Sequence, residues 1–186
     1  MDQWRLVVLG DGDAGTTALA CQFTLSCFAD DPTIEDCYRK QLMVDDRMCF
    51  VEVIDTAGQV EYATLRDQWV REGQAFLLVY SIASRSTFDR LEVFRQTVQR
   101  INGGDSIIIL VGNKCDLPAS KREVSEEEGG ALARQWACEF IETSAKTGHN
   151  VERAFTTLIR ALRASRPPVS PTKPRPPNSK RSCVIM

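Results

Sequence analysis

The sequence predicts an α/β fold in which a mainly parallel sheet is covered by helices. Short apolar segments of strand length alternate along the chain with longer segments whose apolar residues recur at helical spacing. Several strand segments are apolar at nearly every position, which is typical of strands buried on both faces of a sheet. Alternation of such strands with helices is the pattern of parallel α/β proteins.

Six segments are expected to form strands. Asp45-Asp46, between the second and the third, has the composition of a hairpin turn. The predicted strands are Trp4–Leu9, Tyr38–Val44, Cys49–Ile54, Ala75–Tyr80, Ile107–Val111 and Glu139–Glu142.

Five segments are expected to form helices. In the last of them, six apolar residues recur at 3.6-residue spacing and form one face. Ser84 and Ser125 are predicted N-caps, because serine hydroxyls accept hydrogen bonds from the first N–H groups of a helix. The predicted helices are Thr16–Leu25, Leu65–Glu72, Thr87–Ile101, Glu126–Trp136 and Val151–Leu162.

The chain of 186 residues has the length of one domain, and folding is expected to end near Leu162–Ala164. Residues 1–164 are therefore the predicted domain, and residues 165–186 a tail. Positions 165–182 hold six of the eight prolines and one aliphatic residue, Val169, and such a segment cannot bury a core. A spacer is the simplest interpretation of this tail, with a ligand for an SH3 domain as the alternative.

Charge is distributed unevenly between these two parts. The chain has 23 basic and 25 acidic residues, for a formal net charge of −2. Five basic residues and no acidic ones lie after Ser165, so the last 21 residues carry +5 and the first 165 carry −7. This distribution argues against a dedicated nucleic-acid-binding protein, and the basic tail suits an anionic membrane surface.

Other features indicate a cytosolic, reduced protein. No apolar run reaches the length of a membrane span, and the first residues lack the apolar stretch of a signal peptide. The seven cysteines show no metal-ligand spacing.

A glycine-rich segment connects the first predicted strand to the first predicted helix. It reads Gly10-Asp11-Gly12-Asp13-Ala14-Gly15-Thr16-Thr17. Such a turn presents backbone N–H groups to phosphates. The segment matches the phosphate-loop signature G-x-x-x-x-G-K-[ST] at both glycines and at the final hydroxyl, but Thr16 replaces the lysine. Alone the match is weak, because glycine-rich turns between strand and helix are also common for packing reasons.

Three further segments each follow a predicted strand. Asp55-Thr56-Ala57-Gly58-Gln59 places a carboxylate where P-loop proteins support Mg²⁺. Asn113-Lys114-Cys115-Asp116 places another, which can accept hydrogen bonds from the N1–H and amine of guanine, whereas adenine presents an acceptor at N1. Thr143-Ser144-Ala145-Lys146 adds a second loop suited to the base. Each segment alone could be an ordinary turn, but four in this order indicate a guanine-nucleotide site.

With these motifs, the chain resembles the Ras family of small GTPases over about residues 4–163 and again at its last residues. Residues 32–40 resemble the Ras effector segment, and residues 55–62 resemble the second switch. The resemblance implies a P-loop NTPase-type small G domain, monomeric, with a six-stranded mostly parallel sheet and about five helices. It also implies binding of GTP, GDP and Mg²⁺, slow intrinsic GTP hydrolysis, and a role in signal transduction.

The resemblance implies roles for single residues. Thr17 and Thr33 would coordinate Mg²⁺, and Asp55 would hold it through water. Gly58 would sense the γ-phosphate, and Gln59 would orient the attacking water. The residues implied to surround the nucleotide are Gly10, Asp13, Ala14, Gly15, Thr16, Thr17, Phe28, Asn113, Lys114, Asp116, Ser144, Ala145 and Lys146. Those implied to contact effectors are Pro32, Thr33, Ile34, Glu35, Asp36 and Tyr38.

The implied partners are effector proteins, a guanine-nucleotide exchange factor and an activating protein. Nothing in the sequence suggests an arginine finger within the chain, so the activating protein would supply that arginine in trans. Residues 36–42, if at a sheet edge, could pair with a strand of an effector. The alternative is an ordinary edge strand protected by Arg39 and Lys40.

Three departures from the family pattern predict looser nucleotide binding. Thr16 supplies no positive charge, and Asp13 puts a carboxylate where Ras proteins usually have glycine. The segment from Phe28 to Thr33 is two positions shorter than is usual and lacks a tyrosine before Asp-Pro-Thr. Two hypotheses follow: a GTP-binding switch with slow hydrolysis, or a pseudo-GTPase that engages partners with little or no nucleotide.

The sequence ends Cys183-Val184-Ile185-Met186, a C-a-a-X signal that predicts farnesylation of Cys183. An accidental cysteine at this position is the weaker interpretation, because the preceding tail is basic. One lipid chain anchors only reversibly, so the basic tail would provide the second signal. The expected location is the cytoplasmic face of the plasma membrane.

Overall fold

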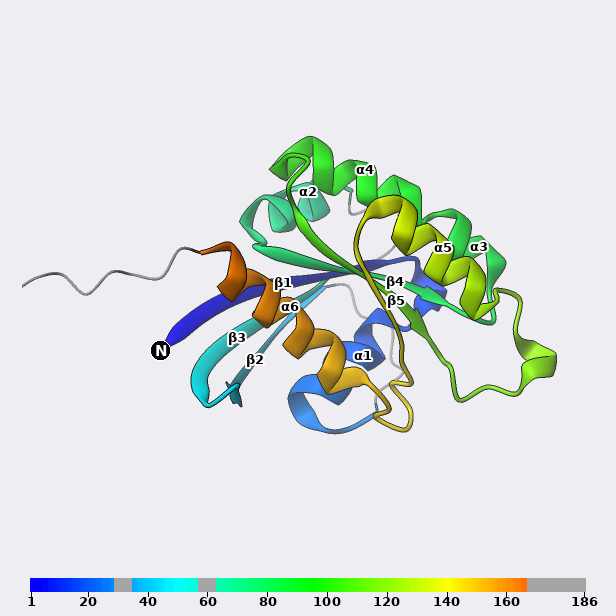
Figure 1. Cartoon of the computed structure of the whole chain (residues 1–186), viewed down its shortest axis with the longest axis horizontal. Helices are drawn as coiled ribbons and strands as arrows, with labels where there is room; N and C mark the ends of the chain where they lie inside the picture. Colours follow the sequence, from blue (N-terminus) through cyan, green and yellow to red (C-terminus); the bar gives the residue numbers. More distant parts are fainter. Residues whose placement is uncertain (29–34, 57–62, 167–186) are drawn as a thin grey trace, which may run out of the picture.

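The computed structural model describes residues 1–28, 35–56 and 63–166. It contains a six-stranded sheet with helices on both faces (Figure 1). The strand order is β2-β3-β1-β4-β5-β6. The β2–β3 pair is antiparallel and every other pair is parallel, which confirms the predicted fold class.

The strands occur in the predicted order, and most extend beyond their apolar cores. Polar residues at their ends still pair, because a ladder of backbone hydrogen bonds does not depend on the side chain. Asp45 and Asp46 form the predicted turn between β2 and β3, with φ of 50° and 58°, as a two-residue hairpin loop requires. The bounds are β1 Asp2–Gly10, β2 Glu35–Val44, β3 Arg47–Thr56, β4 Ala75–Ser81, β5 Ile107–Asn113 and β6 Glu139–Glu142.

Two predicted helices have the predicted bounds, but the single helix predicted over 87–101 is wrong. It is two helices that meet at Arg90. Val93 N donates to Arg90 O, three residues back, so the hydrogen-bond ladder changes its spacing there. The helices are α1 Thr16–Leu25, α2 Ala63–Glu72, α3 Arg85–Asp89, α4 Leu91–Asn102, α5 Glu126–Trp136 and α6 Val151–Ser165, with 3₁₀ turns η1 Gly12–Ala14 and η3 Ala119–Lys121.

Both predicted N-cap serines stand at helix starts. The Ser125 side chain accepts from Glu128 N, and the Glu128 side chain accepts from Ser125 N, which is a complete capping box. Ser84 precedes α3, but its side chain makes no capping hydrogen bond. Its hydroxyl lies 3.1 Å from that of Ser86 instead.

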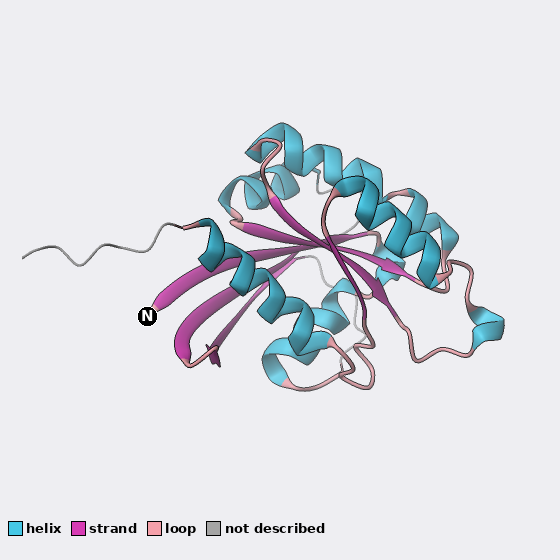
Figure 2. Ribbon diagram, viewed as in Figure 1, coloured by secondary structure: helices cyan, strands magenta, loops and turns pink. Residues whose placement is uncertain are grey.

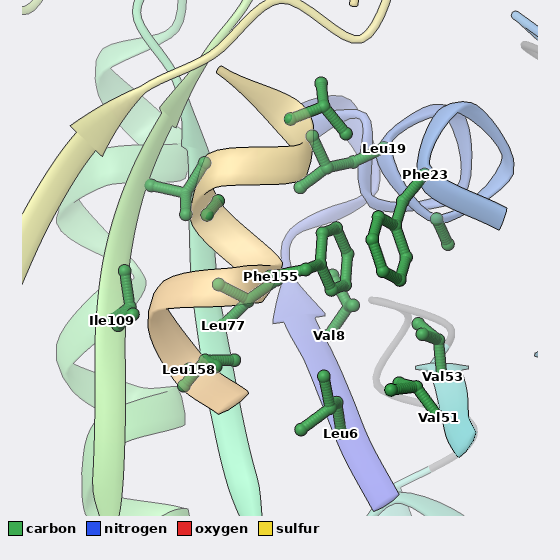
Figure 3. Packing of buried hydrophobic residues seen from close by; sticks show 14 of the residues in the cluster. Leu6, Val8, Leu19, Phe23, Val51, Val53, Leu77, Ile109, Phe155 and Leu158 are labelled. Carbon is green, nitrogen blue, oxygen red and sulfur yellow. The ribbon is translucent and has the colours of Figure 1, made fainter. Parts of the chain in front are cut away.

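The helices form two layers, with α1 and α6 on one face of the sheet and α2, α3, α4 and α5 on the other (Figure 2). Alternate residues of β1 point to the two faces of the sheet. Leu6 and Val8 lie in the core between the sheet and the α1–α6 layer, called the first core here, and Val7 lies in the core on the opposite face, called the second core. Phe23 of α1 stacks on Phe155 of α6 with ring centroids 4.0 Å apart (Figure 3). This stack joins the helix that follows the glycine-rich segment to the rest of the core.

Tyr80 on β4 brings a phenol hydroxyl into the second core without a hydrogen bond to any described residue. Burial raises the pKa of Tyr80. We expect Tyr80→Phe to raise the free energy of unfolding by about 1 kcal/mol, because an unpaired buried polar group costs about 1–3 kcal/mol of desolvation. Urea denaturation measures the free energy of unfolding of the variant and the wild type. Tyr38→Phe is the control, because the hydroxyl of Tyr38 accepts a hydrogen bond from Cys21 Sγ at 3.4 Å. A lower free energy of unfolding in Tyr80→Phe would contradict the account.

The parallel strands β1, β3, β4, β5 and β6 all end at the same edge of the sheet. The described residues of the four motif segments lie at or directly after the ends of β1, β3, β5 and β6, so the fold gathers them along one side of the sheet. No helix in the described ranges is long and apolar enough to cross a bilayer.

Candidate functional site

The segment from Gly10 to Thr17 is a tight loop that leads into the N-terminus of α1. Gly15 has φ of 82°, a conformation in which glycine carries no steric penalty. A Cβ at Gly10 would stand 2.5 Å from Val79 O, and one at Gly15 would stand 2.7 Å from Asn113 Nδ2. Both glycines are therefore required by the packing. The first N–H groups of the ten-residue helix α1 face this loop, as in phosphate-binding loops.

Thr16 is buried, with 6% of its surface exposed. Its Cγ2 lies 3.0 Å from the position of a Cβ at Gly10, so the methyl group packs on the end of β1. The side chain contributes a hydroxyl and no charge to the loop. Asp13, in η1, is exposed and adds a carboxylate there.

Thr17 and Asp55 meet across the gap between α1 and β3. Thr17 Oγ1 donates to Asp55 Oδ2 at 2.6 Å, and Asp55 is 1% exposed at the end of β3. A hydroxyl that donates its proton to a carboxylate keeps its lone pairs for a metal ion. Mg²⁺ is held in proteins by one or two carboxylates, with waters and substrate phosphates completing its shell. Thr17 and Asp55 fit that donor set. The described ranges contain no group of three or more His, Cys, Asp or Glu side chains that could hold a metal ion.

Asn113 joins three of the motif segments. Its Nδ2 donates to Ala14 O at 3.0 Å and lies 3.4 Å from Gly15 O. Its Oδ1 accepts from Ala145 N and from Thr143 Oγ1, both at 3.2 Å. Asn113 is 1% exposed, so the amide acts as a buried joint between the glycine-rich loop, β5 and the loop after β6.

A pocket of about 250 Å³ lies between these segments. That volume is small beside the roughly 300–1,000 Å³ of sites for drug-sized ligands, so it suits one end of a nucleotide. Ser144 Oγ donates to Asp116 Oδ1 at 2.7 Å, which orients this exposed carboxylate. Phe28 is 49% exposed. The pocket is lined by Gly15, Ala18, Phe28, Asn113, Lys114, Asp116, Leu117, Ala145 and Lys146.

The sequence reasoning missed Ala18 and Leu117 in this lining. Leu117 directly follows the motif that ends in Asp116, so adjacency was an available signal. Ala18 lies in the first turn of α1, and only the proximity of α1 to β5 in the fold reveals it.

The predicted effector and switch residues lie partly within and partly outside the described ranges. Glu35 and Asp36 begin β2 and pair through their backbone with Thr56 and Asp55. Tyr38 is half-buried and packs against the first core. The predicted residues that lie outside the described ranges are Pro32, Thr33, Ile34, Gly58, Gln59 and Cys183.

Comparison with known proteins gives consistent matches. A model of the Ras family matches residues 5–164. Protein ras-2 of Neurospora crassa is 49% identical, over 88% of this chain and 80% of that protein. Ras-like protein 1 of Pyricularia oryzae is 48% identical, over 96% of this chain and 81% of its own. Ras-like protein of Laccaria bicolor is 50% identical, over 87% of this chain and 78% of its own.

The family model covers every described motif segment and all of the sheet except the first three residues of β1. The chain therefore belongs to the Ras family of small GTPases, whose members bind GTP and GDP and hydrolyse GTP.

Proposed function

We propose that this protein is a membrane-anchored switch that cycles between GTP and GDP, with slow intrinsic hydrolysis. The observation that carries the proposal is the buried joint at Asn113, which connects the glycine-rich loop to the loop after β6 beside the pocket of Asp116. A site built for phosphates at one end and for a base at the other is thereby held in a single arrangement. Residues 1–164 would form the G domain and 165–186 the tail.

Guanine would be selected at Asp116. The Ser144 hydroxyl donates to Asp116 Oδ1, and Asp116 Oδ2 has no hydrogen-bond partner within the described ranges. This oxygen can accept from the N1–H and amine of guanine, whereas the N1 of adenine would face it with another lone pair. Phe28 and Lys114 would cover the ring, since both line the same pocket.

Phosphates would be held at the N-terminus of α1, with Thr17 and Asp55 supporting Mg²⁺. When bound, the ion supplies positive charge to the phosphate oxygens. Thr33 would add a second hydroxyl and Gly58 a backbone N–H near the γ-phosphate. Gln59 would orient the attacking water.

Partners would act around the nucleotide. An exchange factor would release GDP, effectors would bind residues 32–40, and an activating protein would supply an arginine for hydrolysis. The edge position of β2 supports the effector proposal, because such a strand can pair with a strand of another chain.

Attachment to anionic membrane lipids would combine a farnesyl group on Cys183 with the basic tail. We expect Cys183→Ser to move the protein from the membrane fraction to the cytosol, because the tail alone gives only electrostatic attraction. Fractionation and the intact mass of the C-terminal peptide measure location and lipid separately. Cys27→Ser, at an exposed cysteine in the domain, is the control, and membrane retention of Cys183→Ser would refute the anchor.

A second candidate function rests on Thr16. A buried threonine gives the loop no cation, and Asp13 adds an anion to it. A pseudo-GTPase of this kind would engage effectors or exchange factors as a binding module, with little or no nucleotide.

Equilibrium binding of fluorescent GDP in Mg²⁺, with GTP and ATP as competitors, separates the two functions. We expect GTP to displace the probe and ATP to fail. Asp116→Ala should abolish this preference, whereas Asp105→Ala, an exposed acid in the loop before β5, should retain it. Equal displacement by ATP and GTP would contradict a guanine site, and absence of binding would favour the pseudo-GTPase.

A further inference from the structure

The phosphate loop is tied to the junction of α3 and α4 through Asp11. Asp11 is the N-cap of η1, and its Oδ1 accepts from Gly12 N at 3.0 Å. Its Oδ2 lies 3.7 Å from Arg90 Nε, and both side chains are partly buried. The one carboxylate therefore holds the first turn of the loop and pairs with an arginine from an element 79 residues away.

Arg90 is fixed by the backbone on both sides. Its N–H donates to Ser86 O at 3.2 Å, and its carbonyl accepts from Val93 N at 3.1 Å. This residue is the break between α3 and α4, so the direction of its side chain is set by the point at which one helix stops and the next begins.

A second arginine stands in the same cluster. Arg66 of α2 is buried, and its guanidinium lies over the Phe94 ring, 5.2 Å from the centroid. Burial lowers the pKa of Arg66, and Arg90 lowers it further, whereas Asp67 and Asp11 raise it. The carboxylate of Asp11 thus lies in the field of two cations, one from α2 and one from the α3–α4 junction.

This arrangement matters because of the charge of the loop itself. Residues 10–17 contain two carboxylates, Asp11 and Asp13, and no cation, since Thr16 stands in the lysine position. Carboxylates near a polyphosphate repel it unless a positive group compensates them. Of these two carboxylates, Asp11 pairs with an arginine within the described residues, whereas Asp13 is exposed to solvent.

We propose that Arg90 is a positioning residue of the phosphate loop, which neutralises Asp11, holds it as the cap of η1 and so slows nucleotide release. The inference rests on the proposed nucleotide binding and deepens it. Arg90, at the junction of α3 and α4, would supply part of the positive charge that the phosphate loop itself does not contain.

The test is the release rate of fluorescent GDP in Mg²⁺ at low and high ionic strength. We expect Arg90→Gln to speed release about two- to fivefold at low salt, the scale of partly exposed ion pairs. High salt should shrink the effect, because exposed charges are screened. Arg90→Lys keeps the charge and should stay near the wild-type rate. Arg95→Gln, which breaks a pair with Glu92 on α4, is the control and should leave release unchanged.

Asp11→Asn separates charge from architecture, because asparagine caps a helix as well as aspartate does. We expect Asp11→Asn to slow release below the wild-type rate, and Asp11→Asn with Arg90→Gln to return it to about that rate. A merely structural role of Arg90 would not be reversed by removing the charge of Asp11. If Arg90→Gln does not fold, Arg90→Met, which also removes the charge and keeps a long side chain, replaces it in both measurements.

Wild-type release rates in Arg90→Gln, or no slowing in Asp11→Asn, would overturn the role of Arg90 and leave the nucleotide site standing. A wild-type protein that takes up no GDP would overturn both proposals. The two failures are therefore distinguishable.

Discussion

Thr16→Lys is expected to tighten the binding of GDP and GTP at least tenfold. Hydrogen bonds to charged groups contribute about 1.5–3 kcal/mol, and the lower end of that range already corresponds to a factor of ten. Thr16 is the first residue of α1 and directly follows Gly15, which is the position that the phosphate-loop signature gives to its lysine. Titration with fluorescent GDP in Mg²⁺ measures the gain.

Thr16→Gln is the matched variant, because it has a long side chain without the charge. We expect it to bind no more tightly than the wild type. Equal affinities for the lysine and glutamine variants would show that charge at this position does not limit nucleotide binding, contrary to our account.

Asn113→Ala is expected to lower the free energy of unfolding by about 3 kcal/mol and to weaken guanine-nucleotide binding. The substitution leaves Ala145 N, Thr143 Oγ1 and Ala14 O without a buried partner, and each unsatisfied group costs about 1–3 kcal/mol. Loss of the joint also frees the glycine-rich loop from the loop after β6. Urea denaturation measures the stability, and GDP titration measures the site.

Asn102→Ala provides the comparison. The Asn102 amide donates to Val70 O at 2.8 Å and to Gly73 O at 3.2 Å, and so joins α4 to the end of α2 away from the pocket. We expect a smaller loss of stability and no change in affinity. An Asn113→Ala protein that keeps both stability and affinity would contradict the role of the joint.

Local patterns predicted the parts of the fold that depend on local physics. The Asp45-Asp46 turn, the N-cap at Ser125 and both ends of α1 follow from nearby residues, and the structure has them. The gathering of the motifs also followed from sequence, because parallel strands end at one edge of a sheet.

Contacts between distant elements left no local signal. The break at Arg90 lies inside a segment whose apolar spacing continues as in one helix, and the change in hydrogen-bond spacing there is visible only in the structure. The Asp11–Arg90 pair and the four contacts of Asn113 likewise join segments far apart in the chain. The family resemblance implied that Asn113 is one of the residues around the nucleotide, and the structure shows that its side-chain amide connects the loops.

The nucleotide content of the purified protein tests the central claim most directly. The protein is prepared in Mg²⁺, denatured, and its released nucleotides are separated and identified. Our account predicts guanine nucleotide, and uptake of GTP when the protein is first stripped. A protein that is empty as purified and takes up no GTP at millimolar concentration would contradict the account and leave a binding module without a nucleotide switch.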